Sequence, residues 1–241
     1  MSSKIYFIAD VHLERDDFKK KDLFLAFVEM VKSNGGDLFI LGDLFDYWAN
    51  NRRVMQDNQT IFDALSGLTR NGSKVGFLIG NRDLLLREKV LSRYGIDFLG
   101  ESKKIVLQGK TLLLTHGHLL YTKDVEFQRY RKTKWPIYRM LDLVLPGCIE
   151  NALAKRFILK SKQVIDSQES WRLQFSEETI KEAFNQGIEV IVCGHSHQSM
   201  IKEYDGGKHF IVLPYWNNAK GGYLCMENGG FKLEDFKSNE L

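Results

Sequence analysis

The chain contains 241 residues and carries a formal net charge of +3 at pH 7. Hydrophobic residues make up 44% and charged residues 27%, which is the ordinary balance of a soluble globular protein and excludes a disordered, collagen-like or coiled-coil chain. At roughly 150 residues per domain the length would allow two domains, but α/β chains of this size often form one. We therefore expect a single domain that spans residues 1–241.

The cysteines and the apolar runs indicate the compartment. Three cysteines, at positions 148, 193 and 225, are too few and too scattered for a disulfide framework, which favours a reducing compartment. The first apolar run covers only residues 5–9, too short for a signal peptide, and no stretch approaches the roughly 18 apolar residues of a membrane span. We expect a cytoplasmic protein that can still bind a membrane surface.

The first hundred residues alternate between apolar runs and helical patterns. The runs at 5–9, 38–42 and 75–80 have the length of strands and are continuously apolar, as in a sheet that is buried on both faces. Apolar residues with helical spacing lie between them, at 22–32 and 61–68. This order predicts a β-α-β-α-β unit.

From about residue 97 onward the pattern changes to shorter strands. They are expected at 104–107, 111–115, 188–194, 200–204, 209–213, 223–226 and 231–235. Glycines at 206–207 and 229–230 provide turns between the last of them. The whole pattern predicts an α/β fold with two stacked mixed sheets and helices on the outer faces.

A helical segment at 123–185 interrupts the strands and is broken by Pro136 and Pro146. Residues 129–162 contain nine basic and two acidic residues, a net charge of +7, so the rest of the chain carries −4. This asymmetry suggests an anionic partner, and the large apolar side chains of the segment could bind acyl chains. A nucleic-acid binder would also show a basic run, and core-packing helices with a solvated basic face remain the plain alternative.

Polar side chains with the chemistry of metal ligands follow five of the apolar runs. The clusters are Asp10-Val-His12, Gly42-Asp43-Leu-Phe-Asp46, Gly80-Asn81-Arg82-Asp83, His116-Gly-His118 and Gly194-His195-Ser-His197. Ligands of α/β sheets bind in the crevice beyond the carboxyl ends of the strands, so these clusters are expected to meet there. Carboxylates and imidazoles suit Mn²⁺, Fe²⁺ or Zn²⁺. A single histidine after a strand is usually structural, but five such clusters together predict a metal site.

The order of these motifs across residues 10–197 resembles the calcineurin-like metallophosphoesterases. The resemblance implies a four-layer α-β-β-α sandwich and two divalent ions, which act on both the attacking and the leaving oxygen of a displacement at phosphorus. Asp43 would bridge the two ions. The implied ligands are Asp10, His12, Asp43 and His197 for one ion, and Asp43, Asn81, His116 and His195 for the other.

Arg82 stands where many members of that family have a histidine that can donate a proton to the leaving group. Arginine stays charged and cannot do so, but it can bind a phosphate through two hydrogen bonds. A phosphate leaving group needs little protonation, because its second pKa is roughly 6. Arg82 therefore favours a diphosphate substrate, unless it merely pairs with Asp46 or Asp83.

The Gly-Asn-Arg-Asp motif, together with Trp48 and the residues from His116 to Asp124, is similar to a narrower branch, the UDP-2,3-diacylglucosamine diphosphatases of lipid A synthesis. That branch hydrolyses its substrate at the UMP phosphorus and releases UMP and 2,3-diacylglucosamine 1-phosphate. The similarity implies Mn²⁺ as the metal and residues 123–172 as a helical lid. The implied catalytic residues are Asp43, Asn81, Arg82, His116 and His195. The implied substrate contacts are Asn81, Arg82, Asp124, Ser161, Lys162 and His195.

The sequence therefore predicts an enzyme for a lipid-linked nucleoside diphosphate, bound peripherally to the inner face of the inner membrane, with no nucleic acid as partner. Two alternatives remain. One is another phosphoesterase of the same fold, such as a nucleotide-sugar pyrophosphatase or a nuclease; Arg82 argues mildly against the nuclease. The other is a non-catalytic scaffold, which would be expected to have lost metal ligands, and none of the expected ligands is missing here.

Overall fold

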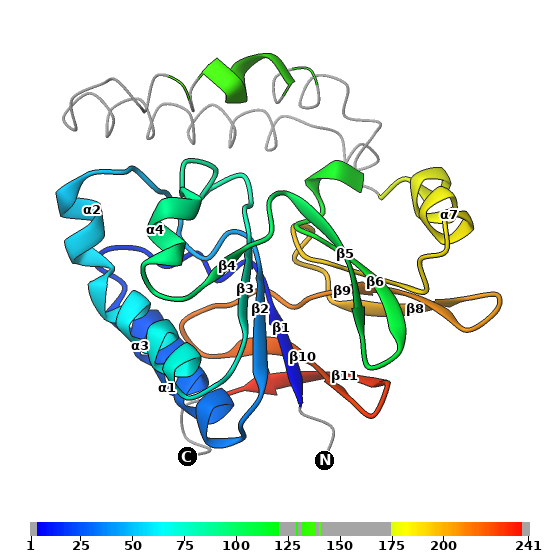
Figure 1. Ribbon diagram of the computed structural model, residues 1–241, viewed down its shortest axis with the longest axis horizontal. Helices are drawn as coiled ribbons and strands as arrows, with labels where there is room; N and C mark the ends of the chain where they lie inside the picture. Colours follow the sequence, from blue (N-terminus) through cyan, green and yellow to red (C-terminus); the bar gives the residue numbers. More distant parts are fainter. Residues whose placement is uncertain (1–3, 121–128, 130–131, 138–139, 141–174, 238–241) are drawn as a thin grey trace.

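The computed structural model describes residues 4–120, 129, 132–137, 140 and 175–237. Two sheets pack face to face, and helices cover the outer face of each (Figure 1). This arrangement confirms the predicted α/β sandwich of two mixed sheets. Most of the expected lid at 123–172 lies outside the described residues, as do Asp124, Ser161 and Lys162.

The first sheet has six strands in the order β11-β10-β1-β2-β3-β4. Strands β1 to β4 run parallel, whereas at one edge β10 is antiparallel to β1 and β11 is antiparallel to β10. The strands are β1 (Ile5–Ile8), β2 (Asp37–Leu41), β3 (Val75–Leu78), β4 (Asp97–Phe98), β10 (Gly221–Glu227) and β11 (Gly230–Phe236).

The second sheet has five strands in the order β5-β6-β7-β9-β8. Its three central strands run parallel, and β5 and β8 are antiparallel edges. The strands are β5 (Ser102–Leu107), β6 (Lys110–Thr115), β7 (Val190–Cys193), β8 (Met200–Tyr204) and β9 (Lys208–Val212).

The helices begin and end at local signals. In α1 the side chain of Asp17 accepts a hydrogen bond from the Lys20 backbone N–H, which satisfies one of the free N–H groups of the first turn. Ser176 caps α7 in the same way through the Thr179 N–H. The helices are α1 (Phe18–Ser33), α2 (Arg52–Asp57), α3 (Gln59–Arg70), α4 (Glu88–Ser92), the 3₁₀ turn η1 (His118–Leu120) and α7 (Glu177–Asn185). No helix of the described residues is both long and apolar enough to cross a membrane.

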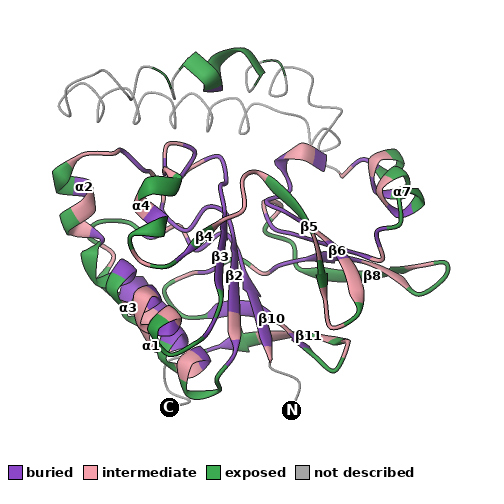
Figure 2. Cartoon of the chain, viewed as in Figure 1, coloured by how far each residue is buried: buried purple, intermediate pink, exposed green. Residues whose placement is uncertain are grey.

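Three apolar clusters fill the spaces between the layers. Figure 2 shows the strands and helix faces that contribute to them as buried. In β1, Tyr6 and Ile8 pack toward α1 and α3, while Ile5 and Phe7 pack toward the second sheet. Successive side chains of a strand point to opposite faces, so a strand with a layer on each side must be apolar throughout. This explains the uninterrupted apolar runs of the sequence and gives the four layers that the resemblance implies.

The parallel strands of both sheets place the chemistry at one edge. β1, β2 and β3 of the first sheet and β6 and β7 of the second all lead directly into the polar clusters of the sequence. Because their carboxyl ends meet at the same edge of the sandwich, segments far apart in the chain come together there.

Candidate metal centre

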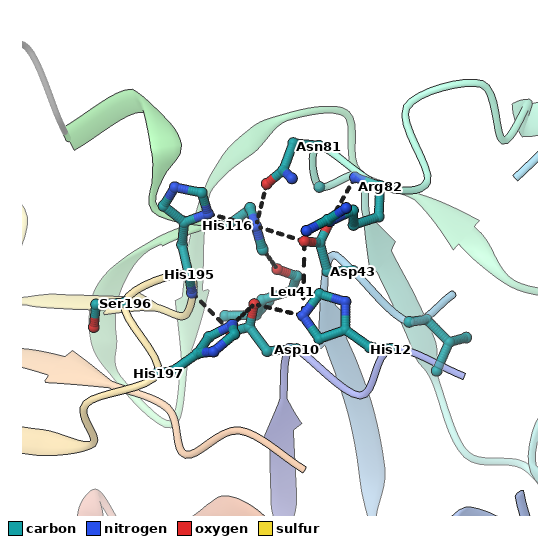
Figure 3. A network of polar contacts seen from close by, with 12 residues as sticks. Asp10, His12, Leu41, Asp43, Asn81, Arg82, His116, His195, Ser196 and His197 are labelled. Carbon is teal, nitrogen blue, oxygen red and sulfur yellow. Dashed lines mark hydrogen bonds and ion pairs between the residues drawn. The ribbon is translucent and has the colours of Figure 1, made fainter. Parts of the chain in front are cut away.

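Eight polar side chains from separate strand ends converge at this edge (Figure 3). Ser196 lies between two of them in the sequence and points away from the cluster, so only the alternate residues of that segment face inward. The converging residues are Asp10, His12, Asp43, Asn81, Arg82, His116, His195 and His197.

The backbone turns sharply at five of these residues. Their φ values lie between 50° and 74°, in the left-handed region that residues other than glycine rarely adopt. The five residues are Asp10, His12, Asp43, His195 and His197. Such a conformation costs free energy and persists only where the surroundings impose it, and it is concentrated at functional sites. Here it ends the strands and aims the side chains inward.

The first group of donors surrounds Asp10. Its Oδ1 atom lies 3.7 Å from His12 Nε2 and 3.5 Å from His197 Nε2. One ligand atom from each of the three side chains lies within 4.8 Å of the others. Asp10 is fully buried, and its Oδ2 atom accepts a hydrogen bond from the His195 backbone N–H at 2.7 Å.

The second group surrounds His116 Nε2. Asn81 Oδ1 lies 3.1 Å from this nitrogen, His195 Nδ1 3.2 Å and Asp43 Oδ2 3.5 Å. Ligands that bind one ion at about 2.1 Å are themselves separated by about 3.0–3.5 Å, so these spacings are those of a coordination sphere. The Leu41 carbonyl accepts a hydrogen bond from His116 Nδ1 at 2.9 Å, which leaves Nε2 as the nitrogen that faces the other donors.

Asp43 connects the two groups. The same oxygen, Oδ2, lies 3.5 Å from His116 Nε2 and 4.0 Å from His12 Nε2. Its other oxygen accepts a hydrogen bond from the Arg82 backbone N–H at 2.8 Å, which fixes the carboxylate in this orientation. One carboxylate oxygen thus faces both groups of donors, as a bridging ligand would.

Asp83 holds the loops that carry Asp43 and Asn81. It is fully buried and accepts hydrogen bonds from the Gly80 N–H at 2.6 Å and the Leu44 N–H at 2.9 Å. Both oxygens of its carboxylate therefore bind backbone N–H groups. In the part of the chain that the structure describes, Arg82 forms no ion pair with Asp46 or Asp83, which removes the structural alternative for this arginine.

The buried carboxylates of the cluster favour positively charged groups beside them. Burial alone would raise the pKa values of Asp10 and Asp43, but the neighbouring histidines lower both. Burial alone would lower the pKa of His116, yet the nearby carboxylates, Asp43 above all, raise it to about 10. Burial, together with His116, lowers the pKa of His195 to about 3, so this ring is neutral at pH 7, as a metal ligand must be.

Unpartnered polar atoms show that these residues fit a metal. Asp10 Oδ1 and both ring nitrogens of His12 are buried and form no hydrogen bond within the described residues. Burying such atoms without a partner is costly, and a divalent cation would satisfy Asp10 Oδ1 and the His12 Nε2 that faces it. Carboxylate, amide and imidazole donors are those that Mn²⁺, Fe²⁺ and Zn²⁺ accept.

Sequence reasoning did not find two features of the site. The first is the pair of hydrogen bonds that Asp83 accepts. The second is the ring of Tyr215, which stacks on that of His197. Like the candidate ligands, Tyr215 follows a strand end, and this position is the feature of the sequence that could have identified it. His118, left open by the sequence, is buried, with its ring 5.6 Å from that of His116 and its Nε2 3.8 Å from Glu101 Oε2.

A four-layer sandwich with carboxylate, amide and imidazole donors gathered at the carboxyl ends of its parallel strands is the arrangement expected of a metal-dependent phosphoesterase. The comparison with protein families agrees, because the calcineurin-like phosphoesterase family matches residues 3–199. The chain belongs to this family, as its motifs predict. It is a metal-dependent phosphoesterase, and its family implies divalent metal ions.

Curated relatives are similar along nearly the whole chain. A UDP-2,3-diacylglucosamine hydrolase of Haemophilus influenzae (strain PittGG) is 31% identical over 93% of this chain and 95% of its own length. A protein of the same name from Stenotrophomonas maltophilia (strain K279a) is 31% identical over 95% of this chain and 96% of its own length.

Solved structures agree on the fold. A dimetal phosphatase from Danio rerio superposes with a TM-score of 0.54 at 14% sequence identity, covering 98% of this chain and 96% of that one. An archaeal phosphodiesterase gives a TM-score of 0.51 at 11% identity, covering 97% and 99%. At these identities the likeness establishes the fold alone, and it confirms the predicted architecture.

Proposed function

We propose that this chain hydrolyses the diphosphate of UDP-2,3-diacylglucosamine to UMP and 2,3-diacylglucosamine 1-phosphate, a reaction of lipid A biosynthesis. The observation that carries the proposal is the match to hydrolases of that name, which extends over 93% of this chain and 95% of the relative. Arg82 supports it independently, because a charged guanidinium suits a diphosphate better than an alcohol leaving group.

Two ions would be held by seven side chains, with Mn²⁺ as the proposed metal. The distances around Asp10 and around His116 Nε2 support two neighbouring sites, and the shared Asp43 oxygen supports a bridge between them. When bound, two such ions activate a water and stabilise the oxygens that attack and leave at phosphorus. The proposed ligands are Asp10, His12, Asp43 and His197 for one ion, and Asp43, Asn81, His116 and His195 for the other.

The chain's own residues orient the substrate and the donors. Arg82 is proposed to bind a phosphate oxygen of the substrate, since its Nη1 atom is buried and has no hydrogen-bond partner within the described residues. Asn81 and His195 lie on the same side of the cluster and are proposed to contact the phosphoryl group as well (Figure 3). The departing sugar phosphate needs little protonation, so no acid has to replace the missing histidine.

The insertion is proposed to bind the lipid part of the substrate and the membrane. We infer a single domain over residues 1–241 with a lid at 123–172, in which Asp124, Ser161 and Lys162 contact the substrate. Described residues of this segment support the inference, since basic and apolar side chains are exposed together. They are Arg129, Lys132, Lys134, Ile137 and Met140. Each basic residue near an anionic surface contributes about 1 kcal/mol.

A substrate panel tests the proposed reaction. Purified protein with Mn²⁺ is incubated with UDP-2,3-diacylglucosamine, UDP-N-acetylglucosamine, bis-p-nitrophenyl phosphate and DNA, and UMP and other products are measured. We expect rapid release of UMP from the acylated substrate alone. Efficient cleavage of the non-acylated sugar nucleotide would favour a nucleotide-sugar pyrophosphatase, and cleavage of DNA would favour a nuclease.

Sedimentation with vesicles tests the proposed location at the cytoplasmic face of the inner membrane. We expect binding to vesicles with anionic phosphatidylglycerol and little binding to neutral phosphatidylcholine. The double variant Lys132→Gln/Lys134→Gln should bind the anionic vesicles more weakly. Equal binding to both kinds of vesicle, or none, would contradict the peripheral location.

A further inference from the structure

The side chain of Tyr215 lies against the most exposed part of the metal centre. Its ring stacks on the imidazole of His197, with centroids 5.3 Å apart and planes 17° from parallel. The side chain of His197 is 46% exposed, whereas those of His12 and His116 are 16% and 0% exposed. Tyr215 thus contacts the imidazole that the rest of the protein restrains least.

The backbone that carries Tyr215 is fixed relative to Asp10. The N–H of the next residue, Trp216, donates a hydrogen bond to the Asp10 carbonyl at 3.2 Å. The indole N–H of Trp216 donates to the Gly222 carbonyl at 3.0 Å, and its ring packs edge-on against Phe27. Trp216 is buried, so the segment has little freedom to move away from the site.

His197 needs such a restraint to face Asp10. Its backbone has a φ of 58°, and its Nε2 atom lies 3.5 Å from Asp10 Oδ1. The ring of His12 contacts it on one side, with centroids 5.5 Å apart at 61°. A half-exposed imidazole can rotate about its side-chain bonds into solvent, and a flat aromatic ring stacked against it opposes that rotation.

We propose that Tyr215 is a positioning residue that holds the His197 imidazole in the orientation required to bind a metal ion. The stacked ring is the active part, because the Tyr215 hydroxyl forms no hydrogen bond to any described residue. Groups that orient a ligand without touching the metal commonly account for a large share of a site's affinity. The inference rests on the proposed function, in which His197 binds one of the two ions.

Calorimetric titration of the metal-free protein with Mn²⁺ tests the inference without reference to turnover. The variants are Tyr215→Phe, which keeps the ring, and Tyr215→Leu, which keeps apolar volume but removes the ring. A matched control is Tyr94→Leu, since Tyr94 also stacks on a ring, that of Phe62 at 4.8 Å and 22°, and belongs to none of the strand-end clusters. Thermal unfolding without metal checks that each variant is folded.

We expect wild type, Tyr215→Phe and Tyr94→Leu to bind two Mn²⁺ ions with similar affinities. Tyr215→Leu should bind one ion as wild type does and the other about tenfold more weakly, the lower end of what loss of an orienting partner costs a metal site. Wild-type affinity of Tyr215→Leu for both ions would overturn the inference, and so would equal weakening in Tyr215→Phe. If the wild type binds no pair of ions, the proposed metal centre itself fails, which separates the two outcomes.

Discussion

At the scale of single residues, Asp43 has the most demanding position. One of its oxygens faces both donor groups, and the other accepts the Arg82 N–H. If it bridges two ions, Asp43→Ala should abolish the binding of both and lower turnover by at least about 10³-fold, since residues of a unit fail together. Elemental analysis after dialysis against Mn²⁺ measures the stoichiometry. Retention of one tightly bound ion would contradict the bridge.

Replacement of Arg82 should weaken the interaction with the substrate and leave the binding of the metal ions unchanged. Arg82→Ala removes a guanidinium proposed to bind the diphosphate, and loss of one such donor costs about 10²–10³ in rate. Arg82→Lys keeps the charge but loses the two-pronged geometry, so it should recover only part of the activity. Steady-state kinetics with the acylated substrate and Mn²⁺ titration together check this. Unchanged kinetics of Arg82→Ala would refute the role.

The sequence predicts the convergence of the site residues because each follows an apolar run of strand length. Strand ends and turns depend on the local sequence, and the common edge of parallel strands follows from the order of the elements. Both can therefore be inferred from a sequence. The use of the Asp83 oxygens and the stack of Tyr215 on His197 depend on how separate loops are spaced in three dimensions. That spacing is set by packing between the layers, which a single sequence does not display.

At the scale of elements, the loops after β2 and β3 form one unit. A side-chain carbon added to Gly80 would collide with the Asp43 carboxylate, so the two loops approach as closely as glycine permits. The carboxylate of Asp83 then binds one backbone N–H from each loop. The elements that position the ligands thus depend on a residue that is itself no proposed ligand.

Asp83→Ala should therefore destabilise the protein and weaken metal binding together. Two buried N–H groups lose their acceptor, at about 1–3 kcal/mol each. Urea denaturation of the metal-free protein measures the loss. Asp63→Ala is the matched control, because Asp63 lies exposed on α3 and only accepts a hydrogen bond from Gln59. Equal stability of the two variants would show that the Asp83 contacts contribute nothing.

The elements that the sequence misses are the short ones. α2 and α4 contain six and five residues, less than two turns, and β4 contains two. A helical period needs several turns to be recognised, and a strand of two residues has no pattern at all. The long elements were predicted because whole faces of each are exposed or buried, which gives their sequences a recognisable pattern of polar and apolar residues.

At the scale of the whole molecule, the metals should stabilise the fold that assembles their site. The donors come from both sheets, so ions between them link layers that are otherwise joined by the apolar cluster between the sheets. A ligand at 100 times its Kd adds about 2.7 kcal/mol to stability, which in a chain of this size corresponds to about 5–10 °C in Tm. We expect a shift of this size when Mn²⁺ is added after chelation. Asp43→Ala should show no shift, and a comparable shift in that variant would contradict the assignment.

The four-layer architecture was predictable from the sequence in its main lines. Continuous apolarity in β1, β2, β3 and β7 requires a layer on both sides of each sheet, and the later hairpins supply the antiparallel edges. The helical lid expected at 123–172 and its substrate contacts remain predictions, because most of these residues lie outside the described part of the chain. Amphipathic pattern indicates a helix but not the surface against which it packs.

The most direct test of the account is hydrolysis of UDP-2,3-diacylglucosamine in ¹⁸O-labelled water with Mn²⁺, followed by ³¹P NMR of the products. The account predicts UMP and the acylated sugar phosphate in equal amounts, with ¹⁸O only in UMP, because water attacks the UMP phosphorus. Label in the sugar phosphate, or the absence of UMP from a preparation that binds two Mn²⁺ ions, would contradict it.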